Sequence, residues 1–172
     1  AKKFGIYAKT NYDVDFSPEE SYQFRQRFFS AYPGLVDWHK AVIYDAHERG
    51  YVSNLLGRKR HLPMLQSDND YERAEAERQA INSPVQGLAS DLILLAINTI
   101  EKDLADVQIV GTIHDAMLML VPKGMEKELG AEVKRIMEYN KYWDKLGCQP
   151  TVPIVAELTV GNWGVGKPLG LS

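Results

Sequence analysis

The expected fold follows from the stretch IVGTIHDAMLMLV, residues Ile109–Val121, an apolar run interrupted once by the polar pair His114-Asp115. Two strands joined at a tight turn would bury the apolar flanks and place Asp115 at or next to the tip. A carboxylate in that position is either satisfied by local backbone donors or holds a cation. The stretch by itself leaves both interpretations open.

The first fifty residues carry helical patterns. Residues 1–12 are short, basic and predicted to be helical. Ser17 can cap a second helix, because a proline follows it and Glu20 completes a capping box. A third amphipathic helix is expected to end at Gly50. An aromatic stripe with the spacing i, i+4, i+8 is predicted to lie in the core: Phe24, Phe28 and Tyr32.

The middle of the chain is predicted to form a basic hairpin and one long helix. Tyr51–Leu56 has the pattern of a strand, and Gly57 turns the chain into a basic run. A helical pattern then extends from about Tyr71 to Leu104. Because Pro84 lies inside it and removes a backbone hydrogen bond, we expect a kink there. Gly87 follows and leaves room for another backbone to approach.

After the central hairpin the chain is predicted to return to a helix and then a strand. The helix has a core-facing stripe of apolar residues: Met125, Leu129, Val133 and Ile136. Strict alternation over Pro153–Val160 predicts a half-buried strand packed beside the hairpin. The whole order predicts an α+β fold, with an antiparallel hairpin and strands packed against several helices, one of them long and kinked.

Composition narrows the class of protein. The chain has 172 residues, enough to bury a core, and a net charge of −3. That charge excludes a surface coated with positive charge, although nucleic acid needs only a local basic face. The single cysteine, Cys148, predicts a reducing, cytoplasmic location. No apolar run reaches transmembrane length, so no membrane partner is expected. The chain begins with Ala1 in mid-pattern, which indicates a fragment of a longer protein.

Two groups of polar residues suggest contact with nucleic acid. Arg78, Asn82 and Gln86 share one predicted helix face, where amide donors can reach minor-groove acceptors that occupy equivalent places in every base pair. Such donors read correct pairing without reading sequence. A basic group in the hairpin offers a rigid mount for phosphate contacts: Arg58, Lys59 and Arg60. A solvated polar stripe and a solvated loop remain the alternatives.

Two longer blocks make the chain resemble a family A DNA polymerase of the bacterial DNA polymerase I type. They are AERQAINSPVQG, Ala76–Gly87, and GRKRHLP, Gly57–Pro63, and the final Val160–Trp163 resembles the terminus of that family. The resemblance covers essentially the whole chain. It implies that residues 1–50 are the C-terminal part of the helical fingers subdomain. It also implies that residues 51–172 are the C-terminal palm region, with the His-Asp hairpin.

The resemblance also implies the roles of individual residues. Asp115 would be one of two carboxylates that bind a catalytic pair of Mg²⁺ ions, and His114 would lie beside the primer terminus. The residues of both polar groups would contact the primer-template duplex. The implied reaction is transfer of deoxynucleotides from their triphosphates to a primer 3′-hydroxyl, during DNA replication and repair.

Two departures from the family pattern are visible. Ala116 stands where the family usually has Glu, which would weaken the positioning of metal or water. The second metal-binding Asp, on an earlier palm strand, and the fingers helix with Arg, Lys and Tyr do not precede Asp115. We therefore expect the active site to need the remainder of the polymerase chain, thumb included, and the fragment alone to be inactive.

Three hypotheses follow for the function. The first is a C-terminal fragment of a template-directed DNA polymerase. The second is a non-catalytic DNA-binding module, either a degenerate polymerase or one subunit of a split polymerase, which Ala116 favours. The third is a phosphohydrolase that uses His114 and Asp115, which is disfavoured because one His-Asp pair cannot build the usual metal site.

Overall fold

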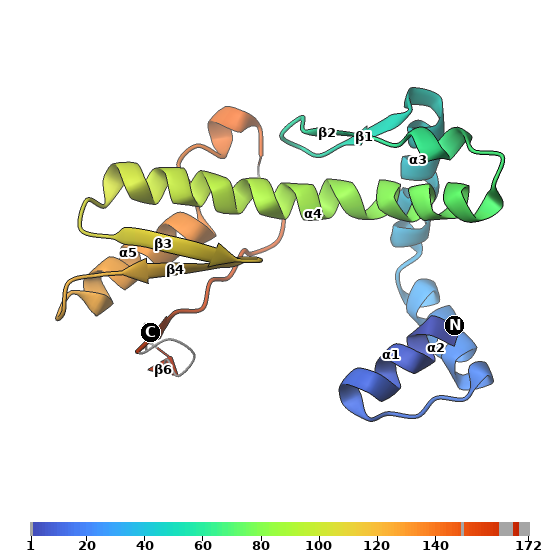
Figure 1. The fold of residues 1–172 in the computed structure, drawn as a ribbon, viewed down its shortest axis with the longest axis horizontal. Coiled ribbons are helices and arrows are strands. Elements are labelled where there is room, and N and C mark those ends of the chain that lie inside the picture. Colours follow the sequence, from blue (N-terminus) through green and yellow to red (C-terminus); the bar gives the residue numbers. More distant parts are fainter. Residues whose placement is uncertain (1, 149, 162–166, 169–172) are drawn as a thin grey trace. The chain divides into compact units, whose positions relative to one another are not determined.

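A computed structural model describes residues 2–148, 150–161 and 167–168. The described helices are α1 (Lys2–Tyr12), α2 (Pro18–Ala31), α3 (Pro33–Arg49), α4 (Asp70–Asp103) and α5 (Glu126–Glu138), with short 3-10 helices η1 (Pro63–Gln66) and η2 (Asp144–Leu146). The described strands are β1 (Tyr51–Ser53), β2 (Lys59–His61), β3 (Gln108–Ile113), β4 (Ala116–Leu120), β5 (Thr159–Val160) and β6 (Lys167–Pro168). They pair antiparallel as β1–β2, β3–β4 and β5–β6 (Figure 1). The predicted α+β class is confirmed.

The chain divides into two compact units. Of the described residues, the first unit holds those up to Gly50 together with Leu62–Ile81. The second unit holds Tyr51–His61 and the described residues from Asn82 onward. The assignment of residues 1–50 to fingers and 51–172 to palm stays a prediction.

The first unit confirms the local signals for its helices. The hydroxyl of Ser17 accepts a hydrogen bond from the backbone N–H of Glu20 at 3.1 Å, and the Glu20 carboxylate accepts from the Ser17 N–H at 2.9 Å. This is the predicted capping box at the start of α2, and it lowers the pKa of Glu20. The next helix, α3, ends at Gly50 as predicted, and Gly50 has a left-handed φ of 71°.

The predicted core position of the aromatic stripe on α2 is wrong. Phe24, Phe28 and Tyr32 are 50%, 44% and 58% exposed. Phe24 stacks on Phe4 with 5.2 Å between ring centroids, and Phe28 contacts Tyr32 at 5.1 Å. The rings therefore contact a few aromatic neighbours without being covered. The i, i+4 spacing aligned the rings on one face, but a further element has to cover that face before it becomes core.

The second unit contains the core around the central hairpin. Six buried residues form its centre: Ala96, Ile100, Val107, Leu129, Val133 and Ile136. They come from α4, α5 and the start of the segment that enters β3, and Ile109, Met117 and Met119 of the hairpin pack against them. Figure 1 shows β3 and β4 (yellow) beside α5 and the C-terminal half of α4. The antiparallel hairpin and the apolar face of α5 are both confirmed.

Helix α4 is one element of 34 residues with Pro84 inside it. The kink expected at Pro84 stays a prediction. By length and composition alone, α4 is long and apolar enough to cross a membrane, contrary to the expectation from the sequence. Its apolar half nevertheless contains Asp91, and Ala96 and Ile100 of the same half lie in the core of the second unit.

The strand predicted over Pro153–Val160 is mostly wrong. Only Thr159–Val160 is a strand, β5, and it pairs with β6 rather than with the central hairpin. Before β5, the backbone N–H of Ala156 donates to the carboxylate of Glu138 at 3.0 Å, so a side chain and not a neighbouring strand accepts this hydrogen bond. Ala156 is buried and Leu158 packs on the core, so the alternation reflects burial without a strand ladder. Asn162 and Trp163, part of the family-like ending, lie outside the described residues.

Candidate nucleic-acid interface

Asp115 and His114 form the turn of the central hairpin. Strand β3 ends at Ile113 and β4 begins at Ala116, and these two residues face each other across the ladder. His114 takes a left-handed φ of 56°, a conformation that His adopts more readily than most residues. Both turn side chains belong to exposed residues. The predicted position of Asp115 at the turn is thereby confirmed, while its chemical role stays a prediction.

The described residues do not make a complete magnesium site. Mg²⁺ is held by oxygen ligands in near-octahedral geometry. Within the described part of the chain, no group of three or more His, Cys, Asp and Glu side chains is placed to hold a metal ion. Asp115 offers one carboxylate and its neighbour Ala116 offers none. At this turn the described residues therefore provide one carboxylate, that of Asp115.

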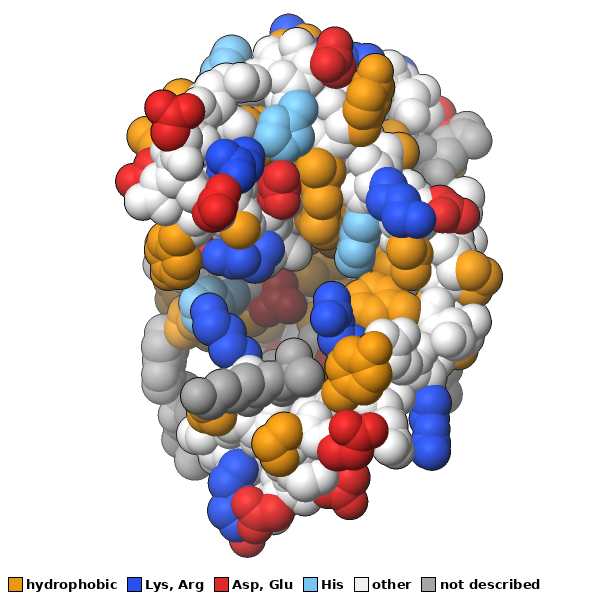
Figure 2. All heavy atoms as spheres, turned by 90° about the vertical axis from the view of Figure 1, so that its right-hand side faces the viewer, with side chains coloured by type: hydrophobic (Ala, Val, Ile, Leu, Met, Phe, Trp, Pro, Cys, Tyr) orange, Lys and Arg blue, Asp and Glu red, His pale blue; other side chains and the backbone are white. Residues whose placement is uncertain are grey.

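The charged side chains of the surface are mixed in sign. On the face shown in Figure 2, Lys and Arg (blue) are interspersed with Asp and Glu (red), as expected for a net charge of −3. A DNA-binding face must therefore be a local arrangement of cations. The β1–β2 hairpin, with three consecutive basic residues, is the place where the sequence concentrates them.

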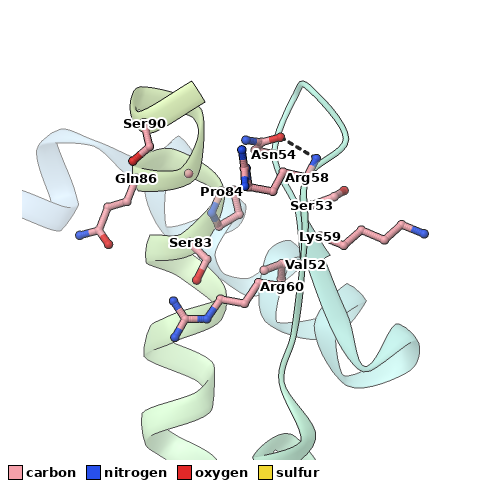
Figure 3. A pocket seen from close by; sticks show the side chains of 11 residues that line it. Val52, Ser53, Asn54, Arg58, Lys59, Arg60, Ser83, Pro84, Gln86 and Ser90 are labelled. Atoms are coloured by element: carbon pink, nitrogen blue, oxygen red, sulfur yellow. Dashed lines mark hydrogen bonds between the residues drawn. The ribbon is translucent and has the colours of Figure 1, made fainter. Parts of the chain in front are cut away.

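The geometry of the β1–β2 hairpin separates its three cations. Arg60 pairs with Val52 and Lys59 pairs with Ser53, so the alternation of β2 directs Lys59 and Arg60 to opposite faces. Figure 3 shows Arg60 extending towards α4 near Ser83, while Lys59 points away from α4. The Lys59 ammonium lies 4.5 Å from the centroid of the Tyr51 ring, a cation–π contact.

The third cation, Arg58, is held by a buried carboxylate on α4. Its Nε donates to Oδ1 of Asp91 at 2.8 Å, and its Nη2 donates to the same oxygen. The Nδ2 of Asn54 donates to the other oxygen, Oδ2, at 2.6 Å. Asp91 is 9% exposed, and these donors, Arg58 first, hold its pKa below the usual carboxyl value. Arg58 is thus an exposed residue whose guanidinium is paired with a nearly buried carboxylate.

A pocket of about 220 Å³ opens between the hairpin and α4. Arg60, Ser83 and Gly87 are among the residues that line it, and Figure 3 shows that Gln86, another of them, points away from the hairpin. A Cβ on Gly87 would lie 3.5 Å from Nδ2 of Asn54, an ordinary contact. The expectation that Gly87 admits another backbone is therefore corrected, because the neighbour is a side-chain amide.

Arg78, Asn82 and Gln86 lie in one uninterrupted helix, α4, so their spacing places them along one side of it. All three are exposed. The Arg78 guanidinium donates to Glu75, with 3.0 Å from Nε to Oε2, and this contact is the first cause of the lowered pKa of Glu75. Whether the three side chains face Asp115 and DNA stays a prediction.

Two residues of this region, Asn54 and Asp91, were not among the candidates from the sequence. A signal for Asp91 was available, because it is a carboxylate among the apolar and small residues of Leu88–Ile97. Asn54 was harder to recognise. Its side chain serves both the turn and Asp91, and its hydrogen bond to Asp91 joins positions 37 residues apart in the chain.

Comparisons with known proteins find similar sequences over most of the chain. A sequence model of DNA polymerase family A matches residues 3–165. DNA polymerase I of Mycobacterium tuberculosis is 33% identical over 149 residues, which are 84% of this chain and 16% of the relative. The thermostable DNA polymerase I of Thermus thermophilus is 34% identical over 147 residues, 84% of this chain and 17% of that protein.

A solved structure has the same fold as much of the chain. The POL domain of Pol1 from M. smegmatis, in complex with DNA primer-template and dNTP, superposes with a TM-score of 0.67 and is 35% identical in sequence. The match covers 72% of this chain and 22% of that structure, so the chain spans a minor part of the proteins it matches. Since the family match extends over nearly all of the chain, the chain belongs to DNA polymerase family A.

Proposed function

We propose that this chain is the C-terminal part of a template-directed DNA polymerase that adds deoxynucleotides to a primer 3′-hydroxyl. The observation that carries the proposal is the exposed His114-Asp115 turn between β3 and β4, in a chain that belongs to this family. Asp115 would supply one oxygen ligand to a Mg²⁺ site that residues outside this chain complete. His114 would lie beside the primer terminus. A cytoplasmic location and roles in replication and repair belong to the same proposal.

The DNA-binding part of the proposal rests on the exposed polar residues of α4 and the hairpin. Asn82 and Gln86 carry amides that can donate to minor-groove acceptors, and Arg78 can reach phosphate. Arg60 and Lys59 add cations on the two faces of β2. A relative of known structure binds primer-template and a deoxynucleoside triphosphate, which supports the same partners here. The remainder of the polymerase is the third partner.

The proposal includes a negative result for the isolated chain. A two-metal site needs carboxylates on both sides of the metal pair, and Mg²⁺ gives up its water reluctantly. Among the described residues Asp115 is the one candidate ligand of the hairpin. We therefore expect the isolated chain to bind primer-template weakly and in a salt-sensitive way, without extending the primer.

The test combines two measurements on the 172-residue chain. Fluorescence anisotropy with a labelled primer-template at several salt concentrations should show binding that weakens as salt rises. Extension of the same primer with Mg²⁺ and all four deoxynucleoside triphosphates should yield no product. Extension that Asp115→Ala abolishes would refute the expected inactivity, and binding that is absent at low salt would refute the DNA-binding face.

A second candidate function is a DNA-binding module without catalysis, favoured by Ala116 at the position where a carboxylate is expected. The intact protein that contains this chain distinguishes the two. Primer extension that is lost on Asp115→Ala supports the polymerase, and Gln86→Ala should slow extension from a matched primer while the fold stays intact. Primer-template binding without extension by the intact protein supports the binding module.

A further inference from the structure

We propose that Asn54, Arg58 and Asp91 form a clamp that fixes the β1–β2 hairpin against α4, so that Asn54 and Asp91 are positioning residues for the DNA-binding face. In this arrangement Arg58 joins the hairpin to α4 through its ion pair with Asp91 and does not contact phosphate. The inference rests on the proposed function, because the surface that the clamp positions is the one expected to meet duplex DNA.

The ion pair with Asp91 competes with phosphate for the Arg58 guanidinium. Two guanidinium nitrogens, Nε and Nη2, donate to one oxygen of Asp91, and Asn54 donates to the other oxygen. The carboxylate is 9% exposed, whereas the Arg58 side chain is 60% exposed. A phosphate that drew Arg58 away would leave a nearly buried carboxylate with its charge uncompensated, which is costly. The ion pair is therefore the more stable use of Arg58.

The same cluster shapes the turn between β1 and β2. The Oδ1 atom of Asn54 accepts the backbone N–H groups of Leu56 and Arg58, each at 3.0 Å, and Figure 3 marks the bond to Arg58. The backbone carbonyl of Asn54 accepts from Gly57 at 3.0 Å. One buried side chain thus closes the turn with its oxygen and ties the turn to α4 with its nitrogen.

Fixing the turn also fixes the cation that follows it. Arg60 leaves β2 on the same side as the clamp and extends towards Ser83 on α4, at the pocket of about 220 Å³ (Figure 3). If the clamp opened, the hairpin would lose the side-chain bonds that join its turn to Asp91 on α4, and the position of β2 relative to α4 would be less fixed. Ordering it again would cost conformational entropy on binding.

The clamp and a direct phosphate contact predict opposite effects of one substitution. If Arg58 contacted phosphate, Asp91 would compete with DNA for it, and Asp91→Asn would tighten binding by releasing Arg58 and removing a negative charge. If the clamp positions the hairpin, Asp91→Asn weakens the ion pair and loosens binding. The sign of the change in Kd therefore separates the two.

The experiment measures Kd and its salt dependence for the full chain with a labelled primer-template. Asp91→Asn should raise Kd about tenfold, the size expected for losing a charge-assisted hydrogen bond. Glu101→Gln, the same loss of one charge at an exposed position of α4, is the matched control and should leave Kd unchanged or slightly lower. Arg60→Ala should reduce the salt slope by about 1.

A second readout needs no DNA and covers variants that fold poorly. Hydrogen exchange of the Leu56 and Arg58 amides should accelerate in Asp91→Asn and in Asn54→Ala, the latter of which keeps the ion pair. Tighter binding by Asp91→Asn would overturn the clamp. Unchanged exchange in both variants would also overturn it. Wild-type chain that binds no DNA would instead refute the proposed function, and the exchange data would still judge the clamp.

Discussion

Asn140 is a buried polar residue of the second unit, outside the candidate interface, and its truncation should destabilise the fold. It is 1% exposed and lies two residues past the end of α5. Its Nδ2 donates to Oγ1 of Thr99 on α4 at 2.9 Å, and its Oδ1 accepts from the backbone N–H of Tyr142 at 3.0 Å. Its Nδ2 also makes a longer bond, 3.4 Å, to the carbonyl of Leu95. Asn140→Ala removes all three bonds from a buried site.

The expected cost follows from these contacts. The two shorter hydrogen bonds at about 0.5–1.5 kcal/mol each give roughly 1–3 kcal/mol, and the Tyr142 N–H left without its acceptor adds about 1 kcal/mol or more. Thr99 keeps one bond, because its hydroxyl donates to the carbonyl of Leu95 at 2.8 Å. We therefore expect a loss of about 2–4 kcal/mol, or a Tm lower by roughly 4–16 °C for a chain of this size.

Urea unfolding and thermal melting of the full chain, followed by far-ultraviolet circular dichroism, measure this loss. Asn98→Ala is the matched control, because it is the same substitution at an exposed position of α4 and should change stability by less than about 0.5 kcal/mol. Thr99→Val completes a double-mutant cycle, in which the two changes should be non-additive. An Asn140→Ala chain as stable as Asn98→Ala would refute the reasoning.

Two further predictions concern the clamp region. Gly87→Ala should stabilise the chain by up to about 1 kcal/mol, because Ala favours helix and the new Cβ meets Asn54 at 3.5 Å without a clash; a lower Tm would show that this site cannot take a methyl group. The hydrogen bond from Arg58 is the first cause of the lowered pKa of Asp91. The ion pair therefore stabilises the fold at any pH above the usual carboxyl pKa. This contribution disappears as the pH falls through the lowered pKa. Asp91→Asn should therefore narrow the gap between the Tm measured near pH 7 and near pH 3, and an unchanged gap would contradict the assignment.

The sequence by itself determined the elements whose causes are local. The capping box at Ser17 and the stop at Gly50 depend on neighbours within one helical turn, and both are present as predicted. The stretch Ile109–Val121 contains both strands of its hairpin and the polar pair that turns between them. In each of these patterns the interacting residues lie close together in the sequence. The α+β class and the position of Asp115 could therefore be predicted without knowledge of the tertiary packing.

Only the tertiary structure decided which surfaces were covered and which distant groups met. The aromatic stripe of α2 has the spacing of a core face, yet Phe24 and Phe28 stay exposed since burial depends on a second element. The alternation before Val160 matched the pattern of a strand. In the structure the backbone N–H of Ala156 donates to the Glu138 carboxylate instead of to a neighbouring strand. The clamp forms because the tertiary fold brings Arg58 and Asn54 to Asp91 from more than thirty positions away in the chain. Spacing along one element fixes directions, whereas a contact between elements also requires the closure of the chain between them.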